Sequence, residues 1–303
     1  MSKIRVLANW KGDSASLVSG CETIVVGVMA YAYPGDGALD YYPCRYGTSR
    51  LLFRGPRRDL DRAYCAVLGG TETYGKFVPE PFPALVEAAT GIRVVNLGCV
   101  NAGLDVYLND PDVIGVAERA RAVVVQIVGA QNLTNRFYAV HPRRNDRFLS
   151  AAPVLRTIFR EVDFTEFHFT RHMLQTLQST SPDRFEVVAE ELRAAWVSRM
   201  RALLARFPAR SVLLWIGDTV PPGPGRRADL SHDPLLVDHE MVAAVRPHAA
   251  AYVEVTGSAE ARALGSAGMA FGPLEAPAAS GLPGPAVHRE IADALGPVLQ
   301  RLI

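Results

Sequence analysis

An apolar segment that runs directly into a glycine-rich loop is the feature that most restricts how this chain can fold. Residues 64–68 read YCAVL and residues 69–76 read GGTETYGK. Glycines let the backbone turn tightly at the carboxyl end of a buried strand, and ligands bind just outside such ends in open α/β sheets. This junction therefore predicts an α/β fold with a site in the loop at 69–76.

The same alternation of strand and helix patterns continues along the chain. Apolar runs predict strands at 64–68, 92–97, 122–128, 211–216 and 251–256. Helical periodicity predicts helices at 82–90, 184–206, 237–246 and 285–302. It also predicts a helix that ends near Ala120. Five such units predict one parallel sheet with right-handed crossovers. We expect the long insertion at 129–183 to cap the carboxyl edge of this sheet.

Composition restricts the class of protein. The 303 residues are 49% hydrophobic and 21% charged, which is enough to form a large core. A formal net charge of +1 argues against a nucleic-acid partner, and no apolar stretch is long enough to span a membrane. The four cysteines show no C-x-x-C spacing, so we expect a cytoplasmic protein without a metal site or other cofactor.

The two ends of the chain differ in regularity. Residues 1–28 add no unit to the alternation, and we expect them to be a non-native or disordered extension. Residues 29–303 are expected to form a single α/β domain that includes the insertion at 129–183.

Two chemical interpretations of the glycine loop remain open. One is a nucleophile turn that presents Thr71 at the end of the strand. The other is a phosphate cradle, because Gly70 to Lys76 satisfies G-x-x-x-x-G-K, and this would indicate a nucleotide- or sulfonucleotide-binding transferase. In the second case Phe77 replaces the Ser or Thr that would bind magnesium.

Several motifs resemble those of the SGNH/GDSL hydrolase superfamily over about residues 62–302. The loop after the first strand is similar to G-D-S-x-x-x-G, with Gly70 in place of Asp and Thr71 in place of the nucleophilic Ser. Further blocks resemble those of the family at Asn96-Leu97-Gly98, at Gly129-Ala-Gln131-Asn132 and in the helix start at Val287-His288. Leu282 stands at the position of the catalytic histidine.

The resemblance implies a three-layer α/β/α fold with a sheet of order 2-1-3-4-5, as in flavodoxin-like proteins. It also implies a hydrolase or acyltransferase acting on an ester or an acylated carbohydrate, with Thr71 or Thr73 near the nucleophile position. The backbone N–H groups of Thr71 and Gly98 and the side chain of Asn132 would form the oxyanion hole. The GGTETYGK loop suggests a bacterial family.

A threonine nucleophile requires a base, and His141 is the candidate. It follows strand 122–128, whose loop adjoins the loop after strand 64–68 at the switch point of a 2-1-3-4-5 sheet. His168 and His172 with Glu166 superficially suggest a metal site, but they lack a further ligand at helical spacing, and we expect no metal there.

The loop after strand 122–128 is rich in arginine. Guanidinium groups bind carboxylates, sulfates and phosphates through paired hydrogen bonds, so this loop predicts a small-molecule or carbohydrate-linked anionic ligand. The expected crevice spans 70–73, 98–101 and 132–147, and its binding residues are Gly70, Gly98, Asn101, Asn132, Arg136, Arg143 and Arg144, with Lys76 from the glycine loop. A catalytically silent protein that binds an anionic or sugar-like ligand is the alternative to the enzyme.

Overall fold

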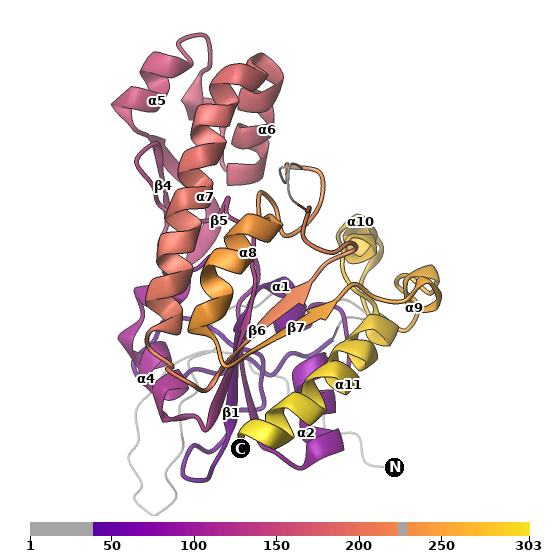
Figure 1. The fold of residues 1–303 in the computed structure, drawn as a ribbon. Coiled ribbons are helices and arrows are strands. Elements are labelled where there is room, and N and C mark those ends of the chain that lie inside the picture. The colour runs from indigo at the N-terminus through magenta and orange to yellow at the C-terminus, as the bar shows by residue number, and fades with distance from the viewer. Residues whose placement is uncertain (1–38, 224–228) are drawn as a thin grey trace, which may run out of the picture. The chain divides into compact units, whose positions relative to one another are not determined.

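The computed structural model describes residues 39–223 and 229–303 (Figure 1). Residues 1–28 lie outside the described residues, so the expectation that they form an extension stays a prediction. Residues Gly35–Ile303 form one compact unit, and the described part of that unit contains the whole α/β alternation.

Five parallel strands form the central sheet in the order β2-β1-β3-β6-β7. β1 pairs with β2 on one side and with β3 on the other, and both pairs are parallel. Numbered within this sheet alone, the order is 2-1-3-4-5, so the predicted five-stranded parallel sheet is confirmed. The strands are β1 (Cys65–Gly69), β2 (Val94–Gly98), β3 (Ala122–Gln126), β6 (Ser211–Ile216) and β7 (Ala251–Val255).

The central strands are mostly apolar because helices cover the sheet on both faces. Every residue of β1, β3 and β6 is buried. α2 (Phe82–Thr90) and α11 (Pro285–Leu302) share one core with β1 and β3, and Figure 1 shows these two helices side by side. α4 (Pro111–Arg119), α7 (Pro182–Leu204) and α8 (His239–Val245) share the core of the other face. No helix within the described ranges is long and apolar enough to cross a bilayer.

The insertion has a structure of its own. It contains an antiparallel hairpin of β4 (Tyr138–His141) and β5 (Arg144–Ala151), followed by α5 (Pro153–Ile158), η1 (Phe164–Glu166) and α6 (Thr170–Thr180). α6 packs against both β5 and α7, which ties the insertion to the main helical layer.

Short elements account for the differences from the expected helices. The segment expected to be helical up to about Ala120 is divided into α3 (Asp105–Leu108) and α4, because Asp110 caps α4 by accepting a hydrogen bond from Val113 N at 3.1 Å. The other short elements are α1 (Thr71–Tyr74), η2 (Arg246–His248), α9 (Ala259–Ala263), η3 (Pro273–Glu275) and α10 (Ala276–Ser280). Four- and five-residue helices are too short to show a hydrophobic period.

Candidate functional site

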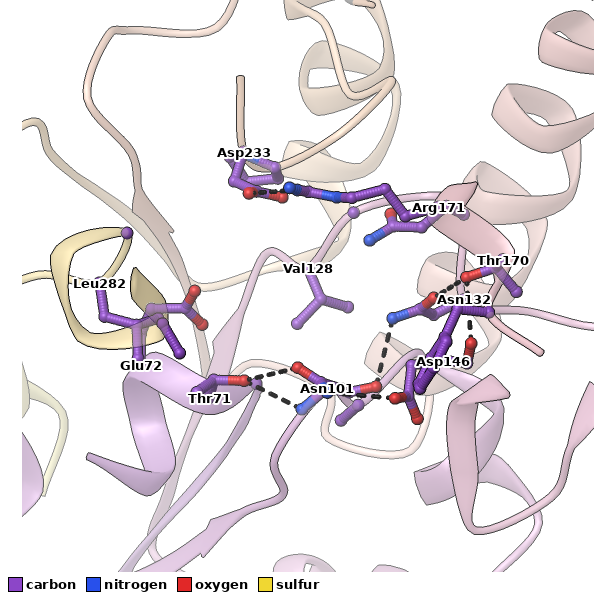
Figure 2. A pocket seen from close by; sticks show the side chains of 18 of the residues that line it. Thr71, Glu72, Asn101, Val128, Asn132, Asp146, Thr170, Arg171, Asp233 and Leu282 are labelled. Carbon is purple, nitrogen blue, oxygen red and sulfur yellow. Dashed lines mark hydrogen bonds and ion pairs between the residues drawn. The ribbon is translucent and has the colours of Figure 1, made fainter. Parts of the chain in front are cut away.

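A pocket of about 590 Å³ lies at the carboxyl ends of β1 and β3. Its walls come from the loops after β1, β2 and β3, from α6, and from the segments around Asp233 and Leu282 (Figure 2). Loops that follow neighbouring parallel strands meet at this edge of the sheet, which is the usual position of ligand sites in open α/β folds. The fold therefore places the glycine loop where the sequence predicts a site.

Thr71 is the first residue of α1, and its buried side chain is held by Asn101. Thr71 Oγ1 donates a hydrogen bond to Asn101 Oδ1 at 3.2 Å and accepts one from Asn101 N at 2.9 Å. The turn that precedes it requires glycine, since a Cβ on Gly69 would lie 2.2 Å from Thr73 Oγ1. The hydroxyl of Thr71 is thus fixed through both its donor and its acceptor capacity by one neighbouring residue.

Asn101 connects three loops of the pocket. Its backbone φ is +55°, in the left-handed region that asparagine tolerates better than most residues. Asn101 Nδ2 donates to Asp146 Oδ2 at 3.1 Å, and Asn101 O accepts from Asn132 Nδ2 at 3.2 Å. Thr170 completes this wall by donating to Asn132 Oδ1 at 2.7 Å. Figure 2 shows the resulting continuous line of hydrogen bonds along one side of the pocket.

Gln126 ends the central strand β3 and holds the carboxyl group of Glu72. Its Oε1 accepts from Gly70 N at 2.9 Å and from Thr73 Oγ1 at 2.6 Å, and its Nε2 donates to Glu72 Oε2 at 2.7 Å. Burial raises the pKa of the half-buried Glu72, while the hydrogen bond from Gln126 opposes that shift. A carboxyl group with a perturbed pKa in a pocket is a candidate for binding or proton transfer.

An ion pair lies on the side of the pocket away from Asn101. Arg171 Nη2 contacts Asp233 Oδ2 at 2.5 Å, joining α6 to the loop between β6 and α8. Figure 2 shows this pair across the pocket from Asn101, with Val128 between them. Both side chains are about half exposed, so the pair is accessible to a ligand.

The structure brings four of the expected site residues into the pocket: Gly70, Thr71, Asn101 and Asn132. Thr73 lies beneath the loop, where its hydroxyl bonds to Gln126. Gly98 does not present its N–H to Thr71, because Gly98 N donates to Asn96 Oδ1 at 2.8 Å. The backbone N–H that faces the Thr71 hydroxyl belongs to Asn101.

The expected base is not at the site. His141 ends β4 outside the pocket, and its Nδ1 accepts a hydrogen bond from Arg143 N at 3.2 Å. All seven histidines lie in the described part of the chain, and none of them hydrogen-bonds Thr71 there. His172 lines the pocket from α6, and its ring contacts that of Phe167 at 5.1 Å.

Arg136, Arg143 and Arg144 do not form the expected anion site, and neither does Arg147 from the same loop. Arg136 pairs with Glu191 at 3.0 Å, and Arg143 and Arg144 are exposed where β4 turns into β5. Arg147 stacks on Phe169 at 4.4 Å, and none of the four lines the pocket. Arg143 and Arg144 thus present their charge to solvent, which is the ordinary location of arginine, while Arg136 and Arg147 are held by Glu191 and Phe169.

The glycine loop forms a helical turn rather than an open phosphate cradle, and the backbone donors at its carboxyl end are used within that turn. Tyr74 N donates to Gly70 O at 3.0 Å, and Gly75 N and Lys76 N both donate to Thr71 O. Lys76 Nζ lies 3.9 Å from Glu275 and 4.5 Å from the ring of Phe77, outside the pocket. These contacts close α1 as a helical turn.

Sequence reasoning missed several pocket residues. Gln126 could have been identified from the sequence, since it is a polar side chain at the carboxyl end of an apolar strand. Glu72 stands beside Thr71 within the predicted loop. Asp146 falls within the expected range 132–147, whereas Arg171 and Asp233 carry no signal in the sequence, because their positions depend on how the insertion and a distant loop pack.

One known protein family matches most of the chain. Residues 29–303 match the profile of a family described as "Domain of unknown function (DUF6473)". No curated protein matches the chain.

Three solved structures are similar in shape at low sequence identity. The lipase Lip_vut3 from a goat rumen metagenome is 10% identical, with 77% of this chain and 96% of that chain covered and a TM-score of 0.38. A protein of Desulfitobacterium hafniense DCB-2 assigned to the lipolytic G-D-S-L family is 14% identical, with 80% and 100% covered and a TM-score of 0.34. A gut microbial diltiazem-metabolizing enzyme is 14% identical, with 79% and 47% covered and a TM-score of 0.37. TM-scores below 0.5 do not establish a shared fold, so the function has to be inferred from the pocket itself.

Proposed function

This chain belongs to the DUF6473 family, and we propose that it binds a polyhydroxylated, sugar-like ligand in the pocket at the carboxyl edge of its sheet. The scaffold is SGNH-like in the order of its sheet and in the position of Thr71 directly after β1. Leu282, which lines the pocket, takes the place of the catalytic histidine. By this resemblance the site has the position of a hydrolase crevice, and a leucine stands where the base of the triad is expected.

The hydrogen bonding of Thr71 is the observation that carries this proposal. A nucleophilic hydroxyl transfers its proton to an adjacent base, usually an imidazole. The Thr71 hydroxyl instead donates to the amide oxygen of Asn101, which does not act as a base at neutral pH. Its position favours contact with a ligand over attack on one.

The chemistry of the walls favours a ligand with many hydroxyl groups. Amides and carboxylates are distributed around the pocket at Asn101, Asn132, Asp146, Gln175 and Asp233. Each offers hydrogen bonds in more than one direction, as recognition of a polyol requires. Phe169 supplies an aromatic ring, 44% exposed, for the apolar face of a sugar.

Hydrolysis or acyl transfer is the second candidate, and Glu72 is the observation that favours it. This carboxyl group lines the same pocket and follows Thr71 in the chain, and burial raises its pKa. A panel of short-chain nitrophenyl esters separates the two candidates. Turnover that is lost in Thr71→Ala would support the enzyme.

Thr71→Val is expected to weaken binding of neutral saccharides by about 1 kcal/mol, close to fivefold, because it removes one hydroxyl without changing the volume of the side chain. Titration calorimetry with neutral mono- and disaccharides measures this change. Thr157→Val is the matched control, since Thr157 is exposed on α5 and its hydroxyl bonds, among the described residues, to Pro153 O alone. Equal affinities of Thr71→Val and the native chain for a bound saccharide would contradict a contact at Thr71.

Asn101→Gly is expected to weaken the same binding while leaving the fold intact. Glycine adopts a φ of +55° without strain and keeps the N–H that faces Thr71, but it loses the bonds to Asp146 and to the Thr71 hydroxyl. We expect a loss of about 1–2 kcal/mol in binding. Asn101→Val is the contrasting variant, because a β-branched residue at this φ should also lower the melting temperature.

A further inference from the structure

Three carboxylates line the pocket, and a side-chain donor of the protein holds one oxygen of each. Gln126 holds Glu72 Oε2 at 2.7 Å, Asn101 holds Asp146 Oδ2 at 3.1 Å, and Arg171 holds Asp233 Oδ2 at 2.5 Å. Each of these bonds orients one carboxylate, and the second oxygen of that carboxylate takes no part in the bond. The pocket therefore presents oriented acceptors from three of its walls.

The charges of these groups are not balanced within the pocket. Among the lining residues that the structure describes, Arg171 is the one guanidinium or ammonium group, and it is paired with Asp233. Neither Glu72 nor Asp146 forms an ion pair with any described residue. A pocket with excess carboxylate attracts cations and repels anions.

A buried amide among the residues that line the pocket also lacks a hydrogen-bond donor. Gln131 is nine-tenths buried and lines the pocket, and its Oε1 has no hydrogen-bond partner within the described residues. An unsatisfied buried acceptor costs about 1–3 kcal/mol, so a donor that reaches it is favoured.

The arrangement suits an organic cation better than a metal ion. In the described part of the chain, no three His, Cys, Asp or Glu side chains lie close enough together to hold a metal. The carboxylates instead lie on separate walls of a cavity of about 590 Å³, which has room for a sugar unit.

We infer that the ligand is built of amino-sugar units, with one ammonium group bound by Glu72 and another by Asp146, while its hydroxyl groups bond to the remaining polar walls. The sugar in this inference rests on the proposed function, and the inference adds that the ligand is positively charged. It reverses the sign of the ligand charge that the arginine-rich loop suggests from sequence.

Titration calorimetry with four probes tests the inference on the full chain. The probes are the β-1,4-linked disaccharides of glucosamine, of N-acetylglucosamine and of glucose, together with 1,4-diaminobutane. We expect the glucosamine dimer to bind at least tenfold more tightly than the two neutral dimers, and to weaken as salt is added. Glu72→Gln and Asp146→Asn should each reduce this preference about tenfold. Glu80→Gln, at an exposed carboxylate outside the pocket, is the matched control.

The outcomes separate the charge from the sugar. If the neutral dimers bind as tightly as the glucosamine dimer, the inferred ammonium group is wrong and the sugar site stands. If only diaminobutane binds, the sugar site is wrong and cation recognition stands. Binding by none of the four probes overturns both. A preference that survives in both carboxylate variants, with circular dichroism showing intact folds, removes Glu72 and Asp146 from the inference.

Discussion

Gly103→Ala is expected to lower the free energy of unfolding by at least about 3 kcal/mol. A Cβ on Gly103 would lie 1.6 Å from the backbone oxygen of Asn132, where no side chain can move aside. The close approach of these two backbones joins the loop after β2 to the loop after β3. Its loss should lower the melting temperature by roughly 6–12 °C, measured by calorimetry.

Gly115→Ala is the matched control for this variant. Gly115 lies inside α4, and a Cβ there would meet only the flexible end of Arg119 at 3.5 Å. Alanine is the better helix former by about 1 kcal/mol, so this variant should be as stable as the native chain or more stable. Equal losses in the two variants would show that the approach of Gly103 to Asn132 is not the cause.

His288 is expected to make the fold sensitive to acid. Burial between α2 and α11 lowers its pKa from 6.5 to about 3, and its Nδ1 accepts a hydrogen bond from Phe82 N at 3.0 Å. The unfolded chain takes up a proton below pH 6.5, whereas the folded chain does not until about pH 3. The stabilisation is therefore present above pH 6.5 and is lost at about 1.4 kcal/mol per pH unit as the pH falls toward 3.

Urea unfolding at pH 7, 6, 5 and 4 measures this effect against His288→Gln. The amide can accept the bond from Phe82 N but does not titrate. By pH 4 the native chain should have lost about 3 kcal/mol more than the variant has, relative to pH 7. Parallel loss in the two chains would show that other groups cause the sensitivity to acid.

The sequence predicts the sheet and the position of the pocket because both depend on local patterns. Buried parallel strands are continuously apolar, and the glycines after β1 mark its carboxyl end. Thr71, Asn101 and Asn132 follow three strands that pair side by side, so their convergence could be expected from the strand order alone.

The charge of the pocket lining could not be predicted in this way. A run of arginines indicates positive charge in a segment but not the direction in which a hairpin points it. Arg143 and Arg144 end at an exposed turn, whereas Asp146, two residues further, faces Asn101. Glu72 is oriented by Gln126, and Asp233 by Arg171, through contacts between segments far apart in the chain.

The pairing of β3 with β6 has a consequence for how the chain folds. These neighbours in the sheet are separated in sequence by all of residues 127–210. Closing so long a loop costs conformational entropy before the strands gain anything from pairing, and contacts of this kind slow folding. The hairpin β4–β5 and the helix pair α6–α7 are local within that loop, and their early formation would shorten the distance that β6 has to close. The segment that carries Asp146 and Arg171 would then become ordered first, and β6 would pair with β3 later.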